Sequence, residues 1–207
     1  MNTKSMNAPA IVAAALTVVG VLLSGCTQPT PEPTPAPATT SSKGVPSPTA
    51  SAAETIGPPK DSAEAIAAAT AATKSYWAVT DQIMNDGGKQ PERIDAVSIG
   101  QARTYIHESA GEVQKQGISI GGSRSVTVTE SYASDATPPG QSVIKNGFVG
   151  LTVCNDVTGS KPVNADGTPG DKGSAPRHIR NIEVTYDASA GKWMVSSIIR
   201  PGAVIAC

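Results

Sequence analysis

The three cysteines of this chain could carry lipid, form a disulfide or act in redox chemistry, and the first of them follows a recognisable sequence pattern. Cys26 follows an apolar run from Ala10 to Leu23, which is preceded by Lys4 and ends in small residues. This layout is typical of a secretory signal. The run is shorter than the roughly 20 apolar residues that a helix needs to cross a bilayer. We therefore expect an exported protein whose mature part has no transmembrane segment.

The apolar run ends in Leu23, Ser24, Gly25 and Cys26, a tetrapeptide that resembles the lipobox of bacterial lipoproteins. In that family a diacylglycerol is attached to the cysteine thiol, and the signal is cut just before it. The resemblance implies a signal peptide over residues 1–25 and acyl chains such as palmitate on Cys26. Two such chains are roughly what stable anchoring to the outer face of the cytoplasmic membrane requires. An ordinary cleaved signal with an incidental cysteine is the alternative.

If Cys26 carries lipid, Cys154 and Cys207 remain as two thiols in an oxidising compartment. We expect these two residues to form a structural disulfide. The bond would tie a central strand to the C-terminus and contribute about 4 kcal/mol in the loop-entropy description. A redox pair is the alternative, although it requires C-x-x-C proximity or a lowered thiol pKa that the neighbouring residues do not supply.

The two histidines, His107 and His178, are the remaining candidates for metal or acid-base chemistry. A zinc site needs three or four ligands at recognisable spacing, and His107 has Gly111 where a helical partner would stand. The segment 164–167 (NADG) imitates part of a calcium loop, but Pro162 occupies a position that needs an acid. We interpret this segment as a turn in a long exposed loop, and we expect no metal and no cofactor.

Charge and composition separate the chain into a front part and a rear part. The 16 Lys and Arg residues balance 17 Asp and Glu residues, so no basic field favours nucleic-acid binding. Nine of the 17 prolines lie between Pro29 and Pro59, whereas all aromatic residues lie between Tyr76 and Trp193. The core must therefore form in the rear part, for which we expect one domain over residues 61–207.

Residues 26–60 contain the lipidated cysteine and a Pro/Thr/Ser-rich stretch without aromatic residues. Such a composition cannot bury a core and indicates a disordered tether. Alternating Pro and Thr favour extended polyproline II structure, which would let the tether reach roughly 100 Å. A Pro-rich ligand for a partner module is the alternative, because the stretch contains P-x-x-P spacing.

Helices are predicted in the first part of the domain. A D-x-x-E start signal at Asp61 predicts a helix that runs to Asp86, where a Gly pair stops it. A second helical piece begins at Pro91, a third ends before Gly117, and no strand is expected between these two. The faces predicted to be buried carry Ala69, Ala72, Tyr76, Val79, Ile83, Ile94, Val97, Ala102, Tyr105, Ile106, Ser109 and Val113.

The pattern then changes to the two-residue period of strands. Val126, Val128 and Tyr132 fall on one predicted face, and Gly147 and Gly150 indicate a bend or bulge. Four strands are expected, over residues 124–132, 143–157, 177–186 and 192–199. In the third of them His178, Arg180, Ile182, Val184 and Tyr186 share one face. Helices followed by an antiparallel meander favour an α+β fold with the helices packed on one face of the sheet.

Several stretches of residues 61–207 resemble exported lipoproteins of actinobacterial type. They are YWAVTDQIMNDGGKQPERIDAV, GLTVCNDVTGSKPVNADG, GKWMVSS and the terminal cysteine. Domains of that kind belong to the nuclear-transport-factor-two-like superfamily. The resemblance therefore implies a cone-like, bent antiparallel sheet wrapped over the N-terminal helices.

Enzymes of the same superfamily, such as ketosteroid isomerases and polyketide cyclases, hold an Asp base and a Tyr or acid proton donor in an apolar cone. On that analogy the acid would be Asp156 and the donor Tyr105 or Tyr186. No position matches a catalytic motif of these enzymes, and fold analogy alone assigns no catalytic residue.

The sequence favours a non-enzymatic binding domain in the cell envelope, anchored to the membrane through the lipid on Cys26. Its partner would be an unknown protein or a small apolar ligand. A small-molecule enzyme of the isomerase or cyclase kind is one alternative. A prophage-type surface lipoprotein that excludes phage DNA is another, by analogy of architecture.

Overall fold

The computed structural model describes residues 57–140, 142–173 and 175–207. The predicted signal peptide, the lipobox and nearly all of the tether lie outside these residues. The elements follow in the order α1 (Ser62–Asn85), the 3-10 helix η1 (Pro91–Ala96), α2 (Gly100–Gln116), β1 (Ser119–Gly121), β2 (Ser125–Ala136), β3 (Ile144–Asp156), β4 (Lys161–Val163), β5 (Arg177–Asp187) and β6 (Lys192–Ile199). The domain is α+β, with the helices before the main sheet, as the sequence predicts.

Helix α1 begins and ends at the predicted signals. The carboxylate of Asp61 accepts a hydrogen bond of 2.8 Å from the backbone N–H of Glu64, which satisfies one of the free donors of the first turn. After Asp86 the chain enters the left-handed region at Gly87, with φ 66°, and the N–H of Gly88 returns to the carbonyl of Ile83. None of the helices in the described ranges is long and apolar enough to cross a membrane.

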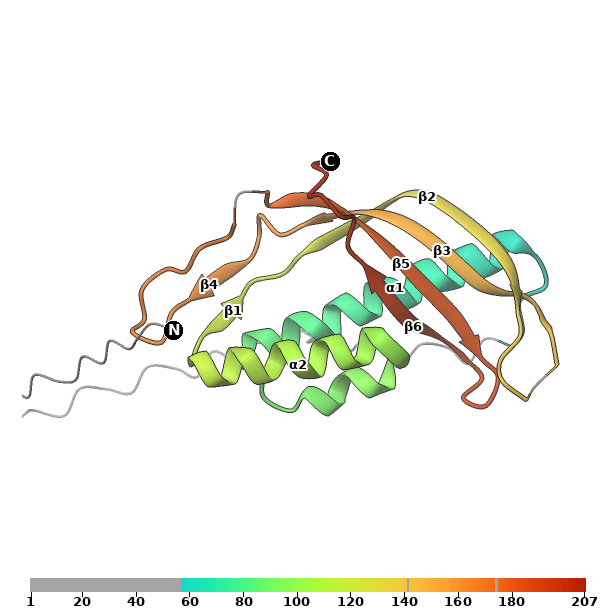
Figure 1. The fold of residues 1–207 in the computed structure, drawn as a ribbon, viewed down its shortest axis with the longest axis horizontal. Helices are drawn as coiled ribbons and strands as arrows, with labels where there is room; N and C mark the ends of the chain where they lie inside the picture. The colour runs from blue at the N-terminus through green and yellow to red at the C-terminus, as the bar shows by residue number, and fades with distance from the viewer. Residues whose placement is uncertain (1–56, 141, 174) are drawn as a thin grey trace, which may run out of the picture. The chain divides into compact units, whose positions relative to one another are not determined.

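The main sheet is antiparallel, with strand order β2-β3-β5-β6, and α1 and α2 pack on one of its faces (Figure 1). Side chains that alternate along the strands point to these helices and form the core. The central strands contribute Val149, Leu151, Val153, Ile182, Val184 and Tyr186, and α1 contributes Tyr76 and Ile83.

The prediction that Tyr132 lies on the buried face with Val126 and Val128 is wrong. The β2–β3 ladder shifts between Val128 and Glu130, so that Thr129 is an extra residue opposite β3. One inserted residue moves every following side chain to the other face. Ala133 packs against the core in its place, and Tyr132 is 59% exposed on the outer face.

Two further pairings were not expected. β1 and β4 form a separate two-stranded sheet beyond one end of the main sheet, within residues that the sequence assigns to loops (Figure 1). Between η1 and α2, Ser98 forms an isolated parallel bridge with Val195 on β6. Strands of three residues or fewer are too short to show a period, which is why the sequence gives no sign of them.

Candidate functional site

Cys154 and Cys207 form a disulfide bond, the pairing that the sequence analysis expects, with their Cα atoms 5.8 Å apart. Cys154 lies on the outer face of β3, opposite Ile179 of β5. The backbone N–H of Ile179 donates to the carbonyl of Ile205 over 2.8 Å. Two adjacent links therefore hold the C-terminal segment against the sheet, and the bond has the position of a structural crosslink.

His178 faces the interior and is buried. Its Nε2 lies 3.0 Å from Nδ2 of Asn155, and its Nδ1 lies 3.0 Å from the carbonyl oxygen of Ala175. Both ring nitrogens are thus engaged. Asn155 is 3% exposed, and its Oδ1 has no hydrogen-bond partner among the described residues. A buried acceptor without a partner among these residues is costly.

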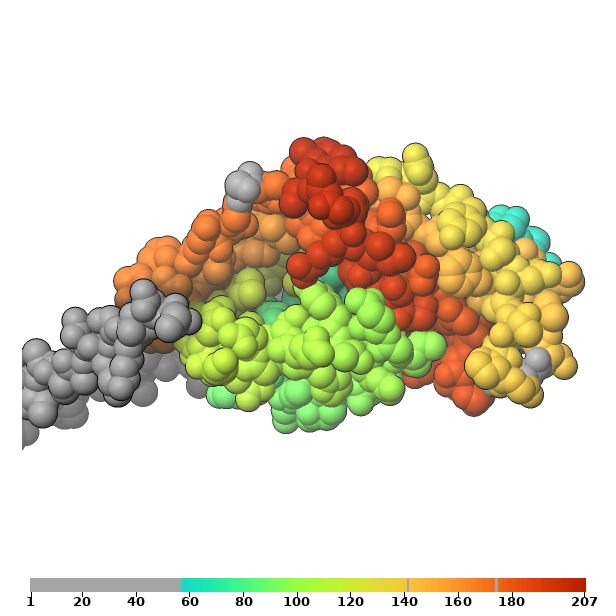
Figure 2. All heavy atoms as spheres, in the orientation of Figure 1, coloured from blue at the N-terminus to red at the C-terminus, as the bar shows by residue number. Residues whose placement is uncertain are grey.

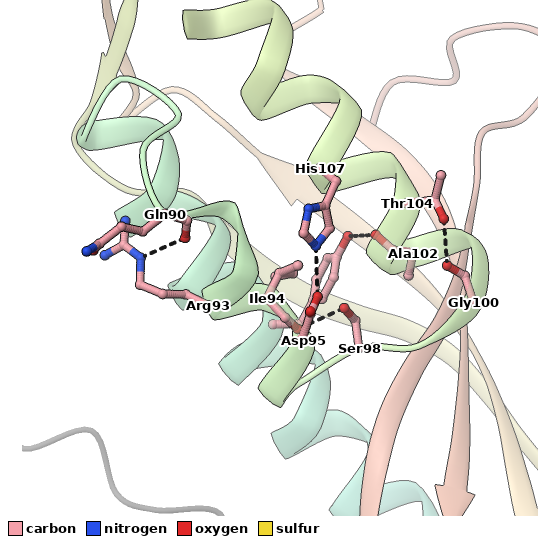
Figure 3. Close-up of polar contacts among 10 residues, drawn as sticks. Gln90, Arg93, Ile94, Asp95, Ser98, Gly100, Ala102, Thr104 and His107 are labelled. Atoms are coloured by element: carbon pink, nitrogen blue, oxygen red, sulfur yellow. Dashed lines mark hydrogen bonds and ion pairs between the residues drawn. The ribbon is translucent and has the colours of Figure 1, made fainter.

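His107 pairs with a carboxylate. Its Nε2 lies 2.8 Å from Oδ1 of Asp95, which joins α2 to η1 (Figure 3). Close by, the hydroxyl of Ser98 donates to the carbonyl of Ile94, and the hydroxyl of Tyr76 donates to the backbone carbonyl of Ala102. Within the described ranges, no group of three or more His, Cys, Asp or Glu side chains is placed to hold a metal ion. The His107–Asp95 and Tyr76–Ala102 contacts each join two helices.

The structure does not bring Asp156 and Tyr186 together. Asp156 accepts hydrogen bonds from Thr158 and lies 3.5 Å from Arg177. The hydroxyl of Thr158 is the main reason that the pKa of Asp156 lies below its ordinary value. Asp156 pairs with the first residue of β5, whereas Tyr186 is near the other end of that strand. At the ordinary rise per residue this places them about 30 Å apart.

Three arginines gather at the end of the domain where β5 begins: Arg124, Arg180 and Arg200, called here the arginine cluster. Arg124 is fixed by Asp81, whose carboxylate accepts from the backbone N–H and from Nε of Arg124 over 2.9 and 2.6 Å. The guanidinium also lies 4.4 Å from the ring centroid of Trp77. Its terminal nitrogens make no hydrogen bond within the described residues.

Arg180 lies on the inward face of β5, two residues from His178 and two from the buried Ile182. Its Nη1 donates to the carbonyl of Ile179 over 3.2 Å, and no carboxylate in the described ranges forms an ion pair with it. Burial lowers the pKa of this guanidinium, and the positive charge of Arg200 lowers it further. The weaker influence of Arg124 acts in the same direction.

Arg200 follows β6 and reaches α2. Its Nη2 donates to the hydroxyl of Tyr105, and its guanidinium lies 5.0 Å from the centroid of that ring. Asn181 pairs with Ile199 in the β5–β6 ladder. Arg180 and Arg200 therefore adjoin the last pair of this ladder, and the charge of Arg200 acts on Arg180. Tyr105, which the superfamily analogy offers as a proton donor, serves here as a partner of Arg200.

The surface of the domain is hollowed in places, and two small cavities adjoin Arg124. Figure 2 shows a depression between α2, the segment that carries β4 and the C-terminal segment, with α1 behind it. Arg124 lines two small cavities of about 170 Å³ each. One of them also contacts Lys74 and Trp77, and the other contacts Ser160 and Lys172. Asp81 lines the first cavity and Asp171 the second, so charged groups of both signs lie at this end of the domain.

Sequence reasoning missed the arginine cluster as a unit. Its one visible signal is Arg180, a charged residue in a strand face that otherwise alternates through Ile182, Val184 and Tyr186. Arg124 and Arg200 stand at the ends of strands, where charged residues are common and carry no special meaning. Their approach to Arg180 depends on the sheet order, which periodicity does not specify.

No protein-family model matches the chain, and no curated protein sequence matches it. A search of solved structures finds the intermembrane space region of the chloroplast protein ARC6, a crystal structure with a TM-score of 0.34 and 12% sequence identity. The match covers 68% of this chain and 97% of that one. At this similarity, nothing about the fold or function of this chain follows from it.

Proposed function

We propose that this protein is a lipid-anchored, non-enzymatic binding domain on the outer face of the cytoplasmic membrane. Cys26, at the end of the apolar run, is the proposed attachment point, and residues 27–60 are the proposed tether. The domain at the end of the tether would then present its binding surface to the cell envelope.

One observation carries the assignment to binding. Polar side chains of the inner sheet face, Asn155, His178 and Arg180, lie toward the end of the sheet where β5 begins, and the other two arginines of the cluster lie near Arg180. A recognition site needs such converging donors and acceptors. An isomerase or cyclase would instead need an acid and a proton donor on one substrate. Asp156 and Tyr186 are about 30 Å apart along the strands, and the other candidate donor, Tyr105, has its hydroxyl bound by Arg200.

We further propose that the domain is a cone of the nuclear-transport-factor-two-like kind. Two features support this assignment: both long helices precede the main sheet and lie on one of its faces, and the ladder between β2 and β3 is interrupted at two places, as a bent sheet requires. The open end of this cone would hold the arginine cluster.

The anchor is tested in cells that express the protein, with a clickable palmitate analogue and external protease. The wild type should incorporate the label, sediment with membranes and be cut by the protease in intact cells. Cys26→Ala should lose the label and either leave the membrane fraction or keep its presegment. Thr27→Ala, next to the box, is the matched control and should behave as the wild type. A Cys26→Ala protein that is processed and membrane-bound would overturn the anchor.

A further inference from the structure

Two cations at the end of the β5–β6 ladder, the partly buried Arg180 and the exposed Arg200, lack an opposite charge among the described residues. The β5–β6 ladder ends at the Asn181–Ile199 pair, and Arg180 and Arg200 are the residues that adjoin this last pair. Like charges placed directly across a ladder destabilise a sheet. Within the described residues neither one forms an ion pair with a carboxylate, and Asp81, the one acid paired in the cluster, is already bound by Arg124.

The cluster is also rich in donors that are not fully used. One nitrogen of Arg180 donates a hydrogen bond to a backbone carbonyl, and one nitrogen of Arg200 donates to the hydroxyl of Tyr105. A guanidinium has five N–H donors in a rigid fork. The remaining donors of the exposed Arg200 face solvent, whereas partial burial of Arg180, which lowers the pKa of its guanidinium, limits how well water reaches the donors of that side chain.

The missing partner must be a compact acceptor with negative charge. Planar guanidinium groups bind the oxygens of carboxylates and phosphates in pairs. At the border of the cluster, Arg124 lines two small cavities of about 170 Å³ each. The net charge of the chain is −1, so the chain as a whole offers no positive field for a polyanion, and a small ligand fits the few arginines better.

We propose that Arg180 and Arg200 form a binding site for a small oxyanion, a phosphate or carboxylate group, with Arg124 at its border. This inference rests on the proposed function as a binding domain and names the chemical class of its ligand. The oxyanion would belong to a free small molecule or to a lipid headgroup at the membrane to which the protein is anchored.

The test uses the full mature protein in non-ionic detergent and isothermal titration at low ionic strength. Three probes separate the sources: inorganic phosphate, benzoate, and the short-chain lipid dihexanoyl phosphatidylglycerol. Arg180→Gln and Arg200→Gln each remove one guanidinium. Arg103→Gln is the matched control, because Arg103 is exposed on α2 and its side chain makes no hydrogen bond or ion pair with the described residues. Circular dichroism and melting confirm that each variant is folded.

The wild type should bind at least one probe, and each cluster variant should lower that affinity about tenfold or more, the effect of losing one charge-assisted hydrogen bond. Arg103→Gln should leave it unchanged. Binding of phosphate or benzoate supports a free ligand, and binding of the lipid alone supports a headgroup. Binding of none of the probes, or an equal loss in the Arg103→Gln control, overturns the inference. Palmitate labelling of the same cells reports separately on the anchor, so the two proposals can fail independently.

Discussion

The ring of Tyr132 lies over Gly150, its partner in the β2–β3 ladder. A Cβ atom at Gly150 would overlap the outer ring atoms of Tyr132. The same ring approaches that of Phe148, with 6.1 Å between centroids. A glycine in the middle of a strand normally weakens it, and here the aromatic ring covers the bare backbone.

Gly150→Ala should therefore displace the Tyr132 ring and lower the free energy of unfolding by about 1 kcal/mol. The cost is limited because Tyr132 is exposed and can turn away. In a Tyr132→Ala background the same change should be neutral or stabilising, because alanine loses less backbone entropy than glycine. Urea unfolding of the four proteins gives the coupling energy, and additive effects would contradict this relationship between the two residues.

Replacing both Cys154 and Cys207 with Ser should lower the free energy of unfolding by about 4 kcal/mol, because the crosslink closes a long loop in the unfolded chain. For a domain of this size the melting temperature should fall by about 8–16 °C. The amide of Ile179, which donates to Ile205 in the C-terminal segment, should also exchange faster. An unchanged melting curve after verified reduction would show that the bond adds nothing to stability.

We expect the free energy of unfolding to fall at alkaline pH because of Tyr76. Burial is the main reason that its pKa is raised above the ordinary 10.0. The folded domain therefore keeps the phenol protonated where the unfolded chain ionises, so its contribution to stability is complete below pH 10 and declines as the pH rises further. Tyr76→Phe should remove this part of the decline.

At neutral pH Tyr76→Phe should cost about 1 kcal/mol, because the carbonyl of Ala102 loses its donor. The exposed Tyr132 provides the control, and Tyr132→Phe should leave the alkaline decline as it is in the wild type. Denaturant unfolding between pH 7 and 11 measures both effects. The same alkaline decline in Tyr76→Phe as in the wild type would show that another group causes it.

The long elements could be predicted from the sequence because each carries a strong local signal. The cap at Asp61 and the turn at Gly87 bound α1 as expected. The alternation along β3 and β5 placed every second residue on the core face: Val149, Leu151, Val153, Ile182, Val184 and Tyr186. Tyr132 was misplaced because a bulge at Thr129 leaves no mark in a period of two. Local patterns report neither inserted residues nor strands of three residues.

The arginine cluster could not be predicted for a different reason. Its members come from the start of β2, the start of β5 and the end of β6, and only the order β2-β3-β5-β6 with its register brings them to one end of the domain. The disulfide, by contrast, could be proposed from a count of thiols and a compartment. Chemistry that depends on few residues of one type is easier to predict than chemistry that depends on topology.

Replacing Arg180 with Met should stabilise the domain in the absence of a ligand. The apolar side chain keeps most of the volume of the arginine stem beside Ile182 and removes the repulsion from Arg200 and Arg124. The gain should be up to about 1 kcal/mol, the size of an unfavourable cross-strand charge pair, which corresponds to about 2–4 °C in melting temperature for a domain of this size. It should shrink in about 1 M salt, where the Debye length is about 3 Å. Arg103→Met, on the exposed face of α2, should give no comparable gain. A domain that melts lower after Arg180→Met at low salt would mean that Arg180 already has an anionic partner within the protein.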